Sequence, residues 1–383
     1  MYESDARTSR DRRFDLKNSF RQIPGSICAP RGFKCAAVFC DIKKLGTGKG
    51  SEKGQKQDLA LIVSDVPAAV AGVFTTNQVC AAPVKISRQR AAKKLARAIV
   101  INSGNANACT GRQGLTDARH MTQLAAKALS IKENEALVCS TGRIGGVCKG
   151  AGMIQPGMAT MLGFIASDAA IEPAALKRAL KIAVEQSFNR ITVDGDMSTN
   201  DSVIALANGL AGNSRSQIRR SQFQNALNHV CLELAKMIVR DGEGTSRFVA
   251  LHLRGARNDR EAGSAARAIA NSSLVRTSWG GGDPNWGRIL CALGYSKAGV
   301  DERIVDVGYA QPGSHKIVFA FRRGRPTNVA LKTLARITSA PEFDLHVNLH
   351  RGRGEFVLYA ADLTEDYVAF NKGDITDPAT LGG

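Results

Sequence analysis

Short apolar runs alternate along the chain with longer segments in which apolar residues recur every three or four positions. The apolar runs predict β-strands at residues 59–63, 69–75, 98–102, 203–207, 316–321 and 356–360. The periodic segments predict helices at residues 115–129, 173–188, 216–239, 265–274 and 328–337. In the second of these segments, Leu176, Leu180 and Val184 share one helical face. The alternation predicts an α/β fold, in one unit or two lobes, with mixed rather than purely parallel strands.

Two polar segments interrupt this pattern. Residues 1–25 are interpreted as a polar N-terminal tail, whose acidic residues do not fit a transit peptide and which lacks the apolar core of a secretory signal. Residues 46–57 are rich in Gly and Lys and predict a surface loop or hairpin, but they lack the GxxxxGK[ST] spacing of a phosphate loop. No apolar run is long enough to predict a transmembrane helix.

The formal net charge of +18 on 383 residues raises the question of nucleic-acid binding. However, the Lys and Arg residues are dispersed, and no aromatic RNA-binding pattern, zinc finger or basic zipper accompanies them. The charge therefore favours a solvated basic surface that attracts anionic metabolites, and nucleic acid is not expected as a partner.

The cysteines number nine, an odd count, and none is spaced as CxxC. A disulfide framework or a zinc site is therefore not expected, and a reducing cytoplasm is the expected compartment. Cys109, Cys139, Cys231 and Cys291 sit in apolar stretches and are predicted to be small core residues.

Common catalytic patterns are missing from the sequence. The chain has no HExxH, GxSxG or GxGxxG, and its six histidines are scattered, so nothing indicates a Ser-His-Asp triad. The acidic segment 194–201 resembles a calcium loop, but Thr199 replaces the glycine of the sixth position and the terminal Glu is missing. We interpret it as a turn whose carboxylates accept hydrogen bonds from backbone N–H groups. No metal ligands and no bound cofactor are predicted.

A Gly- and Pro-rich loop, residues 149–159, leads abruptly into a strand-like segment at Thr160. Taken alone, Thr160 is an ordinary strand-edge residue. If the bond between Ala159 and Thr160 is broken, however, Thr160 carries both a hydroxyl and an α-amine with a pKa of ~7.7–8.0. This amine can accept the hydroxyl proton without a histidine. The preceding glycines permit the strained geometry in which a hydroxyl attacks the carbonyl before it.

Several blocks of the sequence, in order from Pro30 to Asn371, resemble the ornithine acetyltransferase family, the bifunctional glutamate N-acetyltransferases of arginine biosynthesis. The matching blocks are PRGF (30–33), AGVFTTN (71–77), NSGNANACTG (102–111), MATML (158–162), SFNRITVDGD (187–196), DGEG (241–244) and DPNWGR (283–288). The resemblance implies an α/β, mixed-sheet layered fold of the type shared with self-processing aminopeptidases.

The resemblance further implies that the chain cleaves itself between Ala159 and Thr160, into an alpha fragment (26–159) and a beta fragment (160–383). The new N-terminal Thr160 then takes the acetyl group of N2-acetylornithine, releases ornithine and passes the acetyl group to glutamate. The family's oxyanion hole maps onto Thr141 and Gly142, and each such donor is typically worth about 2.7–4 kcal/mol. The family's assembly implies a heterotetramer of two alpha and two beta fragments.

The family's substrate contacts map, besides the nucleophile, onto Lys149, Glu243, Asn371 and Thr376. A Lys and a Glu at one site suit a zwitterionic amino acid, because they offer charge-assisted bonds to its carboxylate and its amine. Considered without the resemblance, the favoured interpretation of Lys149 is a solvated loop residue, and the alternatives for Glu243 and Thr141 are a cap of the helix that follows a turn and a helix N-cap.

The chain departs from the family pattern after Gly142. Here Ser140-Thr141-Gly142 runs directly into residues 143–150 (RIGGVCKG), whereas family members have several dozen residues between these two blocks, including a substrate-binding Thr. We therefore expect this chain to lack one substrate contact and part of the wall of the site.

Three functions are compatible with the sequence. The first is the acetyltransferase, for which acetyl-CoA is an alternative acetyl donor in some family members. The second is amide hydrolysis by the same N-terminal Thr, if the missing wall admits water to the acyl-enzyme. The third is a catalytically impaired, basic binding protein that retains the fold.

Overall fold

The computed structural model describes residues 21, 23–40, 42, 57–141, 148–149, 153–155, 161–214 and 220–371. The tail expected at residues 1–25 and the loop expected at 46–57 lie almost wholly outside these residues. Within them, helices and strands alternate and the strands form two mixed sheets, which confirms the predicted α/β class. None of the helices in this part of the chain combines the length and the apolarity that crossing a bilayer demands.

The first sheet occupies the N-terminal half of the chain. Its strands are β1 (Phe33–Val38), β2 (Leu59–Phe74), β3 (Leu95–Ser103), β4 (Ala136–Thr141), β5 (Cys148–Lys149), β6 (Leu162–Ser167) and β8 (Ser202–Ala207). They pair in the order β4-β3-β2-β8-β6-β5, and β1 also pairs with β2. Strands β4 and β8 are buried along their whole length, as is typical of strands covered on both faces.

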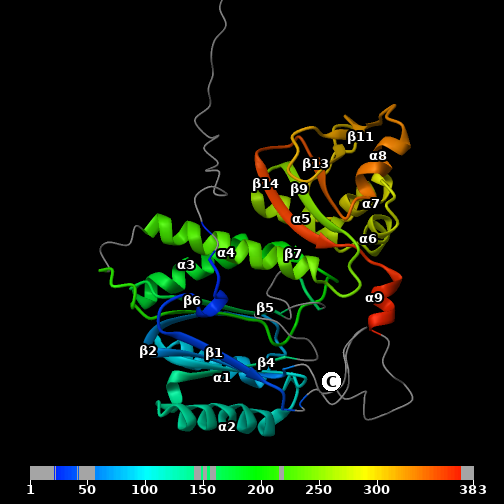
Figure 1. The fold of residues 1–383 in the computed structure, drawn as a ribbon. Helices are drawn as coiled ribbons and strands as arrows, with labels where there is room; N and C mark the ends of the chain where they lie inside the picture. Colours follow the sequence, from blue (N-terminus) through cyan, green and yellow to red (C-terminus); the bar gives the residue numbers. More distant parts are fainter. Residues whose placement is uncertain are drawn as a thin grey trace, which may run out of the picture.

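The long strand β2 contributes to two layers of this sheet. Its register with β3 slips between Val63 and Ala68; before the slip it pairs with β1 and β3, and after it mainly with β8. Side chains from both parts of β2 share one core with Ile99 of β3, Leu137 of β4 and Phe164 of β6. The sheet is thus folded over into a two-layer sandwich (Figure 1).

Helices cover both outer faces of the sandwich. They are α1 (Ala82–Ala91), α2 (Gly111–Leu129), α3 (Pro173–Gln186) and α4 (Arg220–Arg240). Figure 1 shows α1 and α2 below β1 and β4, and α3 and α4 above β6. Helix α3 buries Leu176, Leu180 and Val184 in a core that includes Val203 of β8, so the face predicted from the sequence is the face that packs.

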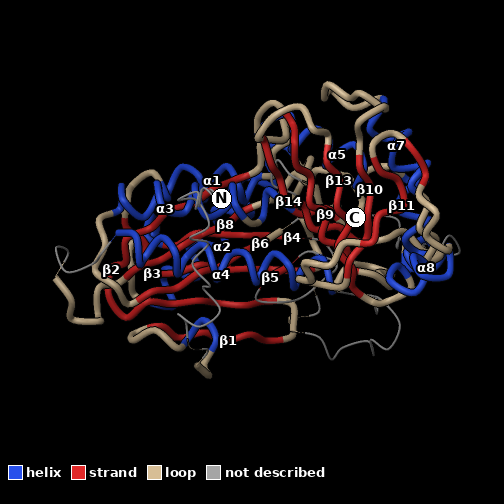
Figure 2. The backbone as a smooth tube through the Cα atoms, turned by 90° about the horizontal axis from the view of Figure 1, so that it is seen from above, coloured by secondary structure: helices blue, strands red, loops and turns tan. Residues whose placement is uncertain are grey.

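The second sheet lies beside the sandwich (Figure 2). Its strands, in the pairing order β12-β11-β10-β13-β9-β14-β7, are β7 (Ile191–Thr192), β9 (Phe248–Ala256), β10 (Asp306–Ala310), β11 (Val318–Arg322), β12 (Arg325–Pro326), β13 (Glu342–Asn348) and β14 (Gly354–Ala361). The helices of this half are α5 (Asp259–Ala270), α6 (Ser273–Gly280), α7 (Trp286–Gly294), α8 (Leu331–Thr338) and α9 (Glu365–Phe370). One face of the sheet packs on α5 to α8 around Trp279 and Phe343, whereas the other shares a core with α4 through Phe248 and Ala250.

The expected division of the chain into elements is wrong at two points. The strands expected at 59–63 and 69–75 form one continuous strand, β2. The helix expected at 265–274 spans a break, because α5 ends at Ala270 and the Ser272 hydroxyl accepts the Val275 N–H to cap α6. A single capping residue therefore divides a segment whose apolar spacing is continuous.

The cysteines predicted to lie in the core divide into two groups. Cys139 and Cys231 are buried as predicted, but Cys109 and Cys291 are exposed, and all four are free thiols. Cys291 follows the buried Ile289 in α7 yet lies on the outer side of that helix. A residue with apolar neighbours in the sequence is therefore not buried in the core when its position on the helix faces the solvent.

Candidate active site

The candidate site lies at one edge of the sandwich, where the carboxyl ends of β3 and β4 meet the amino ends of β6 and β8. Asn200, just before β8, joins the two layers. Its side-chain amide donates to the carbonyl of Ser140 in β4 at 2.9 Å and to that of Ala106, after β3, at 2.6 Å. Because Asn200 is only 3% exposed, both bonds are shielded from water.

Thr141, predicted to belong to the oxyanion hole, is the last residue of β4 and is buried. Its carbonyl accepts the backbone N–H of Gly104, which follows β3, at 3.0 Å. The alternative of a helix N-cap is not tested, because residues 142–147 lie outside the described residues. Gly142, its predicted partner, lies outside the described residues, so the oxyanion hole stays a prediction.

A buried carboxylate holds the chain just before β6. Asp201 accepts the backbone N–H of Met161 at 2.9 Å, and the Asp201 carbonyl accepts the N–H of Thr75 at 3.0 Å. Burial raises the pKa of Asp201 well above its usual value, and the bond from Met161 only partly opposes that rise. Met161 directly follows Thr160 in the chain, whereas Ala159 and Thr160 lie outside the described residues. Asp201 therefore fixes the peptide that leads away from the predicted nucleophile.

A second carboxylate holds the chain on the other side of the predicted cleavage point. Asp194 accepts the backbone N–H groups of Met153 and Ile154, the latter at 2.8 Å. The acidic segment 194–201 is thus a turn whose carboxylates bind backbone N–H groups, as predicted. Its partners flank residues 156–160, and this role in the candidate site is one that the sequence pattern did not indicate.

Glu243 and Asn371, both predicted as substrate contacts, lie together: the Asn371 amide donates to the Glu243 carboxylate at 3.0 Å. The turn that carries Glu243 sits against α9, because the Thr364 hydroxyl donates to the Gly244 carbonyl at 2.6 Å. Gly244 has a φ of +62°, and a Cβ there would come within 2.2 Å of the Tyr367 nitrogen, so only glycine fits. The chain runs from this turn into β9, so the helix-cap alternative for Glu243 is wrong.

Tyr367 links this pair to the Asp194 turn. Its hydroxyl donates to the Asp194 carboxylate at 3.3 Å, and its carbonyl accepts the Asn371 amide at 3.0 Å. Burial and the negative charge of Asp194 raise the pKa of Tyr367 to about 12, so the phenol keeps its proton at neutral pH. Tyr367 is a second residue of the site that the sequence pattern did not indicate.

The backbone of Lys149 lies in β5 opposite Leu162 of β6, two residues after Thr160. This pairing brings Lys149, which the sequence places before the Gly-rich loop, next to the segment that follows the nucleophile. Thr376 lies outside the described residues. The substrate contacts expected of Lys149 and Thr376 therefore stay predictions.

Known proteins resemble this chain over most of its length. The model of the ArgJ family matches residues 43–146 and 143–374. The arginine biosynthesis bifunctional protein ArgJ of Geobacter sulfurreducens is 42% identical over 406 aligned positions, which cover 89% of this chain and 98% of that protein. The protein of the same name from Symbiobacterium thermophilum is 40% identical, with 91% and 98% covered. A crystal structure of arginine biosynthesis bifunctional protein argJ from Bacillus halodurans matches with a TM-score of 0.52 and 40% identity, covering 55% of this chain and 99% of that chain.

The same similarities bear on the residues expected to be missing after Gly142. The two ranges matched by the family meet at residues 143–146 instead of forming one continuous match. The alignment with the Geobacter protein has 406 positions, more than the 383 residues of this chain, so it requires gaps in this chain. Both observations agree with a loss of residues between Gly142 and Arg143.

Proposed function

Because the chain belongs to the ArgJ family, we propose that it transfers an acetyl group from N2-acetylornithine to glutamate, as a glutamate N-acetyltransferase of arginine biosynthesis. The observation that carries this proposal is the 42% identity to a curated ArgJ protein over 98% of that protein's length. The geometry around the sandwich edge supports it, since Asp194 and Asp201 hold the chain on both sides of residues 156–160.

In the proposed reaction the chain first cuts itself. The Thr160 hydroxyl attacks the carbonyl carbon of Ala159, the peptide C–N bond breaks, and water hydrolyses the ester that results. The freed α-amine of Thr160 then takes the hydroxyl proton while the oxygen attacks the acetyl carbonyl of N2-acetylornithine. The amide C–N bond breaks, and ornithine leaves with the proton. The amine of glutamate attacks the acetyl ester, and the Thr160 hydroxyl is regenerated.

Two observations support self-cleavage. The match with the crystallised Bacillus halodurans chain covers 99% of that chain but only 55% of this one. The crystallised chain is therefore little more than half as long as this chain, which is the length expected of a fragment produced by one internal cut. In this chain, Asp194 binds backbone before residues 156–160 and Asp201 binds backbone after them. Both contacts would align the bond before the cut, and the Asp194 contact, which joins the alpha fragment to the beta fragment, would hold the two together afterwards.

The remaining assignments extend the same proposal. Thr141 and Gly142 donate to the oxyanion of each tetrahedral intermediate, whose charge requires fixed donors. Lys149 and Thr376 bind the amino-acid substrate. The fragments 26–159 and 160–383 assemble as a heterotetramer in the cytoplasm. No bound cofactor is required, because both the acetyl donor and the acceptor are substrates, and acetyl-CoA is an alternative donor.

Glu243→Gln is expected to raise the KM for N2-acetylornithine by about 10–100-fold and to leave self-cleavage unchanged. The Glu243 carboxylate offers a charge-assisted bond to the substrate amine, and losing such a bond costs about 1.5–3 kcal/mol. Steady-state kinetics of the cleaved protein measure this effect. Asp241→Asn is the matched control, because Asp241 is an exposed acidic residue of the same turn. Equal KM values for Glu243→Gln and the control would show that Glu243 does not bind the substrate.

Hydrolysis is the second candidate function, because a wall missing after Gly142 would admit water to the acyl-enzyme. Analysis of the products distinguishes hydrolysis from acetyl transfer. With N2-acetylornithine and glutamate together, we expect N-acetylglutamate and ornithine to form in equal amounts. With N2-acetylornithine alone, ornithine release is expected to stop after one acetyl group per Thr160. Continuous release of acetate at the same rate without glutamate would show a hydrolase instead.

A further inference from the structure

Three potential metal ligands lie together on the second sheet, outside the site described above. His252 of β9 is the direct neighbour of His346 in the parallel pairing with β13, and Asp344 precedes His346 by two residues. Leu251 and Leu345, the alternate residues on these strands, point into the core beneath the helices. The two histidines and the aspartate therefore share the opposite face of the sheet.

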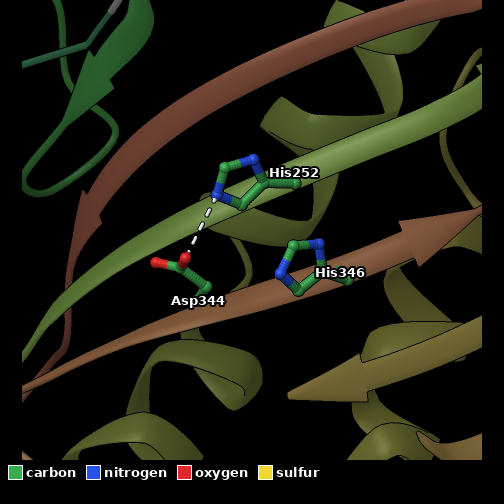
Figure 3. A group of neighbouring side chains, drawn as sticks. All are labelled: His252, Asp344 and His346. Carbon is green, nitrogen blue, oxygen red and sulfur yellow. Dashed lines mark ion pairs between the residues drawn. The ribbon is translucent and has the colours of Figure 1, made fainter. Parts of the chain in front are cut away.

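The three side chains converge (Figure 3). One ligand atom from each lies within 4.8 Å of the others, and both imidazole rings turn a nitrogen toward the Asp344 carboxylate. The rings are stacked, with centroids 4.6 Å apart and an angle of 12° between their planes. Because all three residues come from two paired strands, their relative positions are fixed by the sheet rather than by a loop.

The cluster has polar groups that other described residues do not satisfy. His346 Nε2 is buried and has no hydrogen-bond partner among the described residues. Asp344 is only 6% exposed, and its carboxylate accepts the Gly313 N–H at 2.8 Å. The next carboxylate along the strand, Glu342, is instead neutralised by Arg240 at 2.8 Å. Asp344 thus has a long ion pair with His252, at 3.6 Å, beside an imidazole nitrogen that has no partner among the described residues, and buried polar groups are costly to leave unmatched.

A direct His–Asp hydrogen bond does not account for the arrangement. His252 Nε2 stands 3.6 Å from Asp344 Oδ2, beyond hydrogen-bond distance. Just after β13, His350 Nε2 reaches Asp306 of β10 at 2.8 Å, which shows how close such a pair comes when it bonds directly. The wider spacing, with a second imidazole alongside, leaves room for an ion between the three groups.

We propose that His252, Asp344 and His346 form a binding site for a divalent transition-metal ion, with zinc as the ion that fits best. Imidazole and carboxylate are ligands that zinc prefers, and three protein ligands with one position left to water are a common zinc arrangement. The Gly313 N–H orients the carboxylate, as groups around metal ligands generally do.

The test uses tag-free, full-length protein that has been stripped with a chelator and dialysed. Cobalt(II) is added, its visible absorption is followed, and zinc is then titrated to displace it. Wild-type protein is expected to bind one ion per chain. His346→Gln and Asp344→Asn are expected to weaken zinc binding at least about 10–100-fold, the loss seen when even outer contacts of a metal site are removed.

His350→Gln is the matched control, because it removes a histidine that pairs with an aspartate on the same sheet. Its zinc affinity is expected to equal that of the wild type. Circular dichroism of each variant confirms that it is folded, and a loss of binding in folded His346→Gln and Asp344→Asn supports the site. Wild-type protein that binds no cobalt or zinc, or zinc binding equal in wild type and His346→Gln, would overturn the proposal. Equal loss in His350→Gln would also overturn it.

Discussion

Thr160→Ala is expected to leave the chain in one piece and to abolish acetyl transfer. The variant lacks the hydroxyl that attacks the Ala159 carbonyl and carries the acetyl group between substrates. Loss of a covalent nucleophile lowers kcat by a factor on the order of 10⁴–10⁶. A denaturing gel measures cleavage, and N-acetylglutamate formation measures transfer. The bond from Met161 to Asp201 does not involve this hydroxyl, so the variant is expected to fold.

Thr160→Ser is the matched control, because serine keeps a hydroxyl and, once the chain is cut, an α-amine. This variant is expected to cleave itself and to retain part of the transferase activity. Circular dichroism and thermal melting of both variants separate a chemical defect from a folding defect. Wild-type transfer rates in uncleaved, folded Thr160→Ala protein would contradict the assignment of Thr160 as nucleophile.

Asp201→Ala is expected to slow both self-cleavage and acetyl transfer about 100-fold. The substitution removes the acceptor of the Met161 N–H and leaves a buried donor unpaired, at a cost of about 1–3 kcal/mol. Met161 is joined directly to Thr160, and a small displacement of a reacting group can cost about 100-fold in rate. The half-time of cleavage in freshly synthesised protein and the kcat of the cleaved protein measure the two effects.

Asp201→Asn distinguishes the lost hydrogen bond from the lost charge, because its amide oxygen can still accept the Met161 N–H. It is expected to cleave much faster than Asp201→Ala. Burial raises the pKa of Asp201, so the stability supplied by its protonated form is present at low pH and is lost as pH rises through the folded-state pKa. The unfolding free energy of Asp201→Asn relative to wild type is therefore expected to increase from about pH 4 towards pH 7. An Asp201→Ala protein that cleaves at the wild-type rate would contradict the positioning role.

Local periodicity predicted the elements that bury one face. Helix α3 is the clearest case, because its apolar spacing alone selects the side that packs on β8. Strand β4 was missed, since all six of its residues are buried and its sequence shows no alternation. Strands β1 and β10 were missed as well. Parallel pairing such as that of β9 with β13 depends on residues nearly a hundred positions apart, and no local pattern carries that information.

The residues of the candidate site also fall into those that the sequence could predict and those that it could not. Thr160 and Glu243 could be predicted, because their chemistry and the surrounding blocks are visible in the sequence. Asp194 and Asp201 could be recognised as turn-forming carboxylates, but their partners could not, since each binds a backbone N–H about 40 residues earlier in the chain. The contact between Tyr367 and Asp194 spans 173 residues and was equally invisible.

We expect the shortened connection after Gly142 to affect the site less than its position suggests. Strand β4 keeps continuous register with β3 up to the pairing of Thr141 with Ser103. The edge that supports the predicted oxyanion hole is therefore formed before the point at which residues are missing. We expect the loss to alter substrate affinity more than the position of Thr141.

Intact mass spectrometry of the purified wild-type protein tests self-cleavage at Ala159–Thr160 most directly. Two species are expected, with the masses of residues 1–159 and 160–383, and the second should begin with an unmodified threonine. Incubation with N2-acetylornithine alone should then add one acetyl group to that second species and none to the first. A single species with the mass of residues 1–383, in protein that still makes N-acetylglutamate, would contradict the proposed mechanism.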